Sequence, residues 1–240
     1  MNKTYRKIAV LTGAGISAES GLATFRSSNG LWNNHKVEDV ASIEGFERNP
    51  ALVHDFYNDL KLEIQKAKPN AAHLAVTRLQ REYPAEVNVI TQNVDTLHEK
   101  AGCKNVYHIH GQINQAVCLN CGHILETWGD VDTETVCPHC NIAGMMKPNI
   151  VFFGENLLCM DKVDTILRTC DLFVSVGTSG VVYPAAGFVQ IAKYYGADTI
   201  EFTLDMTANN YLFDRHIYGK AGETLPPYVE ELIKNLPPQA

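Results

Sequence analysis

The sequence lacks an excess of positive charge and lacks any long apolar run. Its 240 residues contain 20 Lys and Arg against 27 Asp and Glu, a formal net charge of −7, which argues against a general nucleic-acid binder. The longest apolar stretch beyond the N-terminus, residues 181–189, contains Pro184 and is well short of the roughly 20 residues that a membrane-spanning helix needs. The apolar run at residues 8–11 is too short for a signal-peptide core. We therefore expect a cytoplasmic protein with no nucleic-acid or membrane partner.

The sequence also lacks a cysteine count that disulfides would explain, because seven is odd. Four of the seven form two C-x-x-C pairs, Cys118/Cys121 and Cys137/Cys140, with fifteen residues between the pairs. Two such pairs at this spacing predict a structural zinc site, in which four thiolates complete a tetrahedral shell and leave no position for water or substrate. A redox pair fits this spacing poorly. The other three cysteines are expected to be small buried hydrophobic residues.

Apolar segments of two kinds alternate along the chain. Runs rich in β-branched residues predict buried strands at residues 7–12, 87–91, 106–109, 172–176 and 199–204. Helical spacing of apolar residues predicts helices over 52–64, 72–80 and 160–170, and a further helix is expected to begin at Ser17. The alternation predicts an α/β protein with a mostly parallel sheet covered by helices on both faces, and with ligands at the carboxyl ends of the strands.

A glycine-rich segment follows the first predicted strand. Gly13-Ala14-Gly15-Ile16-Ser17-Ala18 fits the pattern G-x-G-x-x-[GA], in which backbone N–H groups at a helix N-terminus can hold a pyrophosphate. A tight strand–helix turn is an equally good interpretation. A dehydrogenase is disfavoured, because the acidic residue expected about 20 positions later has no good candidate.

Polar residues follow two other predicted strands. Asn93 and Asp95 come after the strand at 87–91, where they can bind a ligand or act as turn and helix-cap residues. His108 and His110 face the same way in an extended segment. A histidine before a glycine at a strand end can be a general base near neutral pH, or a structural histidine. The spacing alone does not choose between these roles.

Taken together, these segments resemble the sirtuins in order and spacing over nearly the whole chain. The segments are 13–17, 21–26, 91–95, 110–111, the four cysteines, 147–155 and 177–179, and the stretch from Asp39 to Asn58 is most similar to the bacterial deacylase branch. The resemblance implies a Rossmann-like domain formed by 1–29, 74–110 and 147–240. A helical insertion at 30–73 and a zinc-ribbon insertion at 111–146 would form a smaller domain.

The resemblance also implies an enzyme that consumes NAD to remove acyl groups, most often acetyl, from protein lysines, releasing nicotinamide and O-acyl-ADP-ribose. The catalytic residues would be His110, the general base, and Asn93 and Asp95, which would also hold nicotinamide and ribose. The remaining NAD-binding residues would be Gly13, Ala14, Gly15, Ile16, Ser17, Phe25, Arg26, Trp32, Gln92, Val94, Gly177, Thr178, Ser179, Thr203 and Ala221. The substrate, an acyl-lysine protein or peptide, would contact a monomeric enzyme at Tyr57, Val151, Phe152, Phe153, Gly154 and Val181.

Three positions depart from the family pattern. Leu60 replaces the arginine that would pair with acidic acyl groups such as succinyl, and Lys61 lies about 100° further around the helix. We therefore expect acetyl or longer apolar acyl groups to be preferred. Thr203 replaces an asparagine, which predicts lower NAD affinity. Lys147 replaces an arginine, which keeps the positive charge and loses the planar, two-pronged guanidinium donor.

Two other functions stay open. NAD-dependent ADP-ribosyl transfer would use the same pocket on a different nucleophile. A non-catalytic module binding through its zinc ribbon is disfavoured by the acidic balance and by the polar set Asn93, Asp95 and His110.

Overall fold

In the computed structural model, which describes residues 4–24, 31–32 and 35–236, a six-stranded parallel sheet forms the centre of the protein. The strands run in the order β11-β10-β9-β1-β4-β5, which is that of a doubly wound Rossmann sheet whose winding reverses between β1 and β9. Their bounds are β1 (Lys7–Thr12), β4 (Glu86–Thr91), β5 (Val106–His108), β9 (Leu172–Val176), β10 (Asp198–Thr203) and β11 (Arg215–Tyr218). The five predicted strands are confirmed to within one residue at each end. Strand β11 was not predicted.

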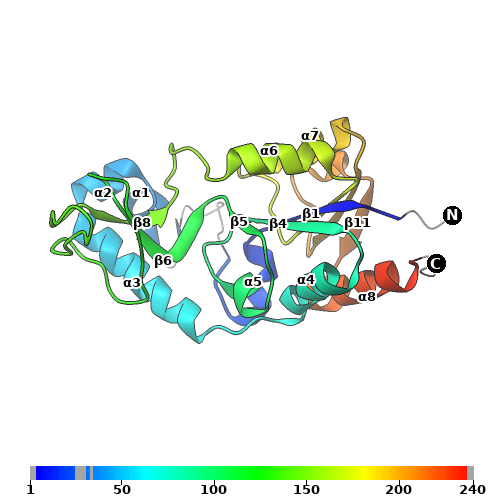
Figure 1. The fold of residues 1–240 in the computed structure, drawn as a ribbon, viewed down its shortest axis with the longest axis horizontal. Helices are drawn as coiled ribbons and strands as arrows, with labels where there is room; N and C mark the ends of the chain where they lie inside the picture. The colour runs from blue at the N-terminus through cyan, green and yellow to red at the C-terminus, as the bar shows by residue number, and fades with distance from the viewer. Residues whose placement is uncertain (1–3, 25–30, 33–34, 237–240) are drawn as a thin grey trace.

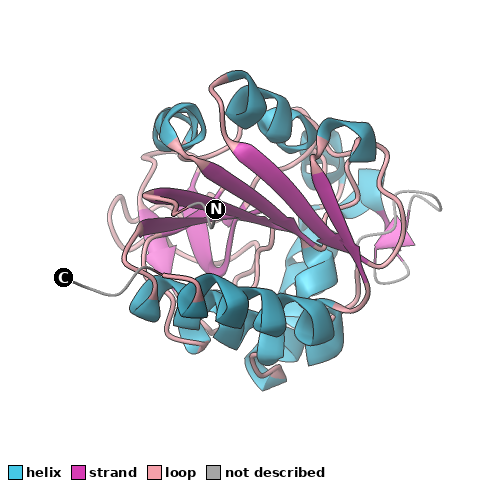
Figure 2. Ribbon diagram, turned by 90° about the vertical axis from the view of Figure 1, so that its right-hand side faces the viewer, coloured by secondary structure: helices cyan, strands magenta, loops and turns pink. Residues whose placement is uncertain are grey.

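Helices cover both faces of this sheet (Figures 1 and 2). Helices α4 (Ala71–Glu82) and α8 (Ala221–Lys234) lie on one face, and α6 (Met160–Thr169) and α7 (Phe188–Tyr194) lie on the other. Side chains of β1 alternate between two cores: Ile8 and Val10 pack on the α4/α8 side, and Ala9 and Leu11 on the α6/α7 side. Burial on both faces explains why the strands are nearly continuous apolar runs.

A smaller sheet lies at the end of the molecule away from both termini (Figure 1). Antiparallel strands β6 (Gly111–Cys118), β7 (Ile124–Glu126) and β8 (Met146–Ile150) form it in the order β7-β6-β8. Beside it are β2 (Leu31–Trp32), β3 (His35–Lys36), α1 (Val37–Val40), α2 (Ile43–Arg48) and α3 (Pro50–Lys66). Tyr57 and Leu60 of α3 share one core with Ile113 of β6 and Ile150 of β8. The two inserted segments therefore fold together.

The α-helix predicted to begin at Ser17 is wrong. Two short 3-10 turns, η1 (Ala14–Ile16) and η2 (Ala18–Ser20), occupy this segment, and Gly21 ends it with φ 84°. Backbone bonds to the end of β9 fix this segment in a non-α-helical conformation. Gly13 N–H donates to Val176 O (3.0 Å), and Gly15 N–H donates to Gly177 O (2.9 Å). The remaining short elements are α5 (Leu97–Lys100), η4 (Ala185–Gly187) and η5 (Asn210–Leu212). No helix in the described part of the chain is long and apolar enough to cross a membrane.

Candidate active site

A cleft of about 550 Å³ lies at the carboxyl ends of the parallel strands. One side of it is formed by residues that follow β1, β4, β9 and β10, and the other by α3 and the segment 150–155 after β8. This is the edge of a doubly wound sheet at which ligands bind. The cleft thus lies between the large sheet and the smaller one.

The floor of the cleft at the winding reversal is made of glycine backbone. A Cβ on Gly15 would lie 2.7 Å from Gly177 Cα, and a Cβ on Gly177 would lie 2.4 Å from Ile16 N. Gly177 also has φ 64°, a conformation that side chains disfavour. Close backbone packing therefore requires these glycines, and the N–H groups of Gly13 and Gly15 are already bonded within the protein. The segment does not offer the helix N-terminus expected from its sequence.

Asn93 and Asp95 are buried and belong to one hydrogen-bond chain. Asn93 Nδ2 donates to Ser17 Oγ (3.1 Å), and Ser17 Oγ donates to Asp95 Oδ2 (2.8 Å). Asp95 Oδ1 accepts Leu97 N–H at 2.9 Å, a turn bond to the residue two positions on, just before α5. Burial raises the pKa of Asp95, and the bonds from Leu97 and Ser17 oppose this rise. Asp95 therefore acts as a turn residue and also lines the cleft.

His110 and His108 each donate a hydrogen bond to a backbone carbonyl, and the two carbonyls belong to consecutive residues. The two histidines differ in the contacts of their other ring nitrogen. His110 Nδ1 donates to Gln92 O (2.9 Å), which leaves Nε2 as the basic nitrogen in the cleft. His108 Nδ1 donates to Asn93 O (3.0 Å), and its Nε2 lies 2.8 Å from Glu99 Oε1. Both ring nitrogens of His108 therefore have a contact, whereas His110 keeps one ring nitrogen available in the cleft. Burial lowers the pKa of His110 and so favours the neutral imidazole, and the bond to Gln92 opposes this shift.

The segment 151–155 connects the histidine to the smaller sheet. Val151 N–H donates to His110 O (2.9 Å), and Phe153 N–H donates to Ala41 O (2.8 Å). The ring of Phe152 stacks on Tyr57, with centroids 6.0 Å apart. Tyr57 and Leu60 line the same end of the cleft from α3. Lys61 points elsewhere, since its Nζ donates to Gly129 O at 2.7 Å.

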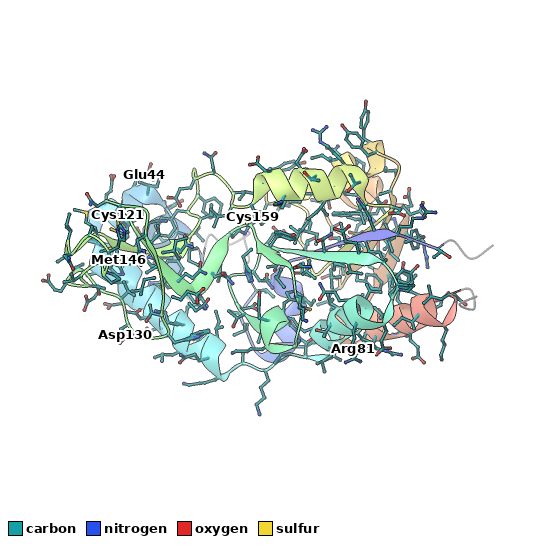
Figure 3. The ribbon with its side chains drawn as sticks, in the orientation of Figure 1. Glu44, Arg81, Cys121, Asp130, Met146 and Cys159 are labelled. Carbon is teal, nitrogen blue, oxygen red and sulfur yellow. The ribbon has the colours of Figure 1, made fainter. Side chains whose placement is uncertain are left out.

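The four paired cysteines come together at the far end of the smaller sheet, where Figure 3 labels Cys121. Their sulfurs all lie within 4.8 Å of one another, and two pairs, Cys118 with Cys140 and Cys121 with Cys137, are 3.7 Å apart. A tetrahedral zinc with Zn–S bonds of about 2.3 Å requires sulfurs about 3.8 Å apart. The cluster therefore fits one structural zinc. Of the other cysteines, Cys103 and Cys170 are buried as expected, whereas Cys159 is exposed.

Most of the predicted site residues line the cleft, namely Gly13, Ala14, Gly15, Ser17, Tyr57, Gln92, Asn93, Val94, Asp95, His110, Val151, Phe152, Phe153, Gly154, Gly177, Thr178, Ser179, Thr203 and Ala221. Two predicted residues lie outside the lining: Ile16 is buried in the α4/α8 core, and Val181 is exposed. Phe25, Arg26 and the side chain of Trp32 lie outside the described residues.

Sequence reasoning missed part of the lining. At the apolar end it missed Leu22, Ala41 and Ile64, and at the other end the loop 204–207 and Gly219. Ile64 had a usable signal, because positions 57, 60 and 64 fall on one face of a helix. The loop 204–207 had only its place after a strand of the predicted sheet.

Comparisons with known proteins agree with this architecture. A family model described as the Sir2 family matches residues 13–184. The chain is 52% identical over 241 residues to the NAD-dependent protein deacylase SIR2rp3 of Leishmania major, covering 97% of this chain and 98% of that protein. It is 50% identical over 238 residues to an NAD-dependent protein deacylase of Vibrio vulnificus, covering 98% and 97%.

Solved structures are similar over nearly the whole chain. A Sir2 homolog–NAD complex superposes with a TM-score of 0.87 at 35% identity, covering 96% of this chain and 90% of that one. A structure of Sir2 bound to acetylated peptide superposes with a TM-score of 0.81 at 30% identity, covering 95% and 93%.

Proposed function

Because the chain belongs to the Sir2 family, we propose that it is an NAD-dependent deacylase of protein lysines that prefers acetyl and longer apolar acyl groups to succinyl. The observation that carries the proposal is the position of His110. Its Nδ1 is fixed on Gln92 O, and its basic nitrogen lies in the cleft between the glycine floor and the segment 151–154. A neutral imidazole held in one tautomer is suited to take a proton from a ribose hydroxyl.

NAD fits the half of the cleft built on the large sheet. Gly13, Gly15 and Gly177 leave an open backbone floor there, and Asn93 and Asp95 provide amide and carboxylate groups at its buried end. When bound, NAD supplies the ADP-ribosyl group that receives the acyl oxygen and releases nicotinamide. Ala14, Ser17, Gln92, Val94, Thr178, Ser179, Thr203 and Ala221 complete this half.

The acyl-lysine substrate fits the other half. Val151, Phe152, Phe153 and Gly154 lie along it, and backbone there suits pairing with an extended peptide. The acyl group would lie against Tyr57 and Leu60. An apolar leucine leaves a carboxylate unpaired in a desolvated pocket, which costs free energy, and Lys61 does not supply the missing cation, because its ammonium is bonded to Gly129 O.

We further propose the domain division 1–29, 74–110 and 147–240 against 30–73 and 111–146, and a monomer that acts on proteins in the cytoplasm. The core that Tyr57 and Leu60 of α3 share with Ile113 of β6 supports the grouping of 30–73 with 111–146. The net charge of −7 supports basic, lysine-containing protein partners over nucleic acid.

Mass spectrometry of an acetyl-lysine peptide incubated with NAD tests the activity. The wild-type protein should deacetylate the peptide and form O-acetyl-ADP-ribose, and His110→Ala should slow this by about 10²- to 10⁴-fold, the usual contribution of a general base. An NAD-dependent mass gain on protein instead would support ADP-ribosyl transfer. No reaction by the wild-type protein would contradict the proposal.

The acyl preference has its own test, Leu60→Arg. The arginine should raise kcat/KM for a succinyl peptide relative to an acetyl peptide by about tenfold or more, since a charge-assisted pair contributes about 1.5–3 kcal/mol. Leu62→Arg is the matched control, because Leu62 is exposed on the same helix and does not line the cleft. Clear succinyl preference by the wild-type enzyme would contradict the proposal.

A further inference from the structure

Lys147 carries a buried charge whose two hydrogen bonds and one cation–π contact all lie in one short segment. Its side chain lies on β8 and is 5% exposed. Nζ lies 2.8 Å from Ile150 O, 3.0 Å from Glu155 Oε2 and 3.8 Å from the centroid of the Phe152 ring. An ammonium has three N–H donors, and a buried cation is costly unless it is paired. Burial lowers the pKa of Lys147, and the bond to Glu155 opposes this shift.

The partners of Lys147 belong to the segment that runs along the substrate half of the cleft. Glu155 Oε2 also accepts the backbone N–H of Phe152 at 2.7 Å. The Phe152 ring is 1% exposed and stacks on Tyr57 at the acyl end. Lys147 itself does not line the cleft, whereas Ile150, Phe152 and Glu155 do. The lysine can therefore affect a ligand only through these neighbours.

The same segment is tied to the catalytic histidine. Val151 N–H donates to His110 O, one residue beyond the carbonyl that Lys147 holds. A shift of the segment would thus move both the acyl end and the backbone beside His110. The glycine floor of the NAD half is fixed separately, by bonds between the turn after β1 and the end of β9.

We propose that Lys147 is a positioning residue for the acyl-lysine substrate, which fixes the segment 150–155 between His110 and the acyl end of the cleft through Ile150, Phe152 and Glu155. The inference rests on the proposed deacylase function. It predicts that loss of the ammonium weakens the peptide site and spares the NAD site. A lysine that only stabilises the fold would affect both sites alike.

The test compares Lys147→Met with two matched variants. Methionine keeps an unbranched chain of similar length and removes the charge and the donors. Lys147→Arg keeps the cation and should rescue. Lys61→Met is the control, because Lys61 is also 5% exposed and also donates to a backbone carbonyl, Gly129 O, but does not hold the cleft segment. Measurements are the KM and Kd for an acetyl-lysine peptide, the Kd for NAD, kcat and Tm.

Lys147→Met should raise the peptide KM and Kd by about tenfold, the effect of losing charge-assisted bonds of about 1.4 kcal/mol. The Kd for NAD should stay within about twofold, Lys147→Arg should restore peptide binding, and Lys61→Met should leave both affinities unchanged. If Lys147→Met does not fold, Glu155→Gln is used, which retains an oxygen for Phe152 N–H but lacks the charge. It should weaken peptide binding in the same selective way.

Unchanged peptide affinity in the Lys147 or Glu155 variant would overturn the inference, as would equal losses of peptide and NAD affinity. A wild-type protein that binds the peptide but does not deacylate it would contradict the proposed function, and the binding measurements would still decide the role of Lys147.

Discussion

The two sheets of this protein are stabilised in different ways. Strands β1 and β9 are buried almost throughout, and their side chains fill a core on each face. Strand β6 alternates between buried and partly exposed residues, and β7 is largely exposed. Among the residues that the structure describes, five buried side chains form the core at the cysteine end, those of Ala116, Cys118, Val131, Cys137 and Met146. Apolar burial can hold the large sheet together, whereas the cysteine end of the smaller sheet has so small a core that it needs a metal.

This difference matters for the cleft, because each sheet builds one half of it. The NAD half rests on backbone packed between β1 and β9. The substrate half rests on the segment that follows β8, a strand of the metal-dependent sheet. Stability of the two halves should therefore be separable by experiment.

Metal removal should give the largest difference in stability between the two sheets. A strong chelator, or Cys137→Ser at a fully buried ligand, should unfold the smaller sheet, because structural zinc in small domains contributes about 10 kcal/mol or more. Hydrogen exchange should show lost protection in β6 and β8 with protection kept in β1 and β9. Deacylation should be lost with it. Cys159→Ser, at an exposed cysteine outside the cluster, is the control, and equal loss of protection in both sheets would contradict the separation.

Substitution in the glycine floor should have a smaller effect than metal removal, and it should affect the NAD half of the cleft. Gly177→Ala would place a Cβ 2.4 Å from Ile16 N and force φ 64° on a side chain, a cost of about 1–3 kcal/mol for the conformation with the clash in addition. Tm and NAD affinity should both fall. Gly196→Ala separates the two causes, since Gly196 has φ 93° and open space around it. A Tm loss no larger than that of Gly196→Ala would show that the close packing is unimportant.

The sequence predicted best what depends on local pattern. Strands buried on both faces, such as β1 and β9, appear in the sequence as uninterrupted apolar runs. The spacing of the two cysteine pairs alone indicates which four residues bind the metal. Edge strand β11 was missed because only Ile217 of its four residues is apolar. The pattern was too weak to distinguish this edge strand from a loop.

Features that depend on side-chain and backbone contacts in the folded chain were not predictable from local pattern. The helix at Ser17 fails because its turn is bonded to β9, more than 150 residues away. His108 and His110 look alike in sequence, and only the structure shows that Nε2 of His108 contacts Glu99. The partners of Lys147 are close in sequence, but nothing in that pattern shows that all three face one ammonium.

Acid should weaken the large-sheet region through buried histidines. Burial lowers the pKa of His98 to about 3 and that of His73 to about 4, against an unfolded value near 6.5. Between pH 6.5 and 4 the unfolded chain binds more protons, so stability falls as pH falls, by up to about 1.4 kcal/mol per pH unit for each histidine. Above pH 6.5 these two groups cause no change.

His73→Gln tests this contribution. A glutamine can still accept the backbone N–H of Asn70 that His73 Nδ1 accepts at 3.3 Å, but it does not titrate. Denaturant unfolding at pH 7 and at pH 5.5 should show a smaller loss of stability in the variant than in the wild type. Zinc loss on acidification affects both proteins alike, so equal pH slopes would rule out a contribution from His73.

The smallest expected effect is at Thr203, where the resemblance to the sirtuins implies a contact with the adenosine ribose of NAD. Thr203 Oγ donates its proton to Asp205 O (2.8 Å), so towards a ribose it can only accept, whereas asparagine offers both an N–H and a carbonyl. Thr203→Asn should lower the Kd for NAD by about two- to fivefold, which corresponds to one modest hydrogen bond. Isothermal titration measures this, with Thr203→Val as the control that removes the hydroxyl. Peptide affinity should not change, because the segment 150–155 is held from β8. An unchanged Kd for NAD would mean that the ribose makes no bond at this position.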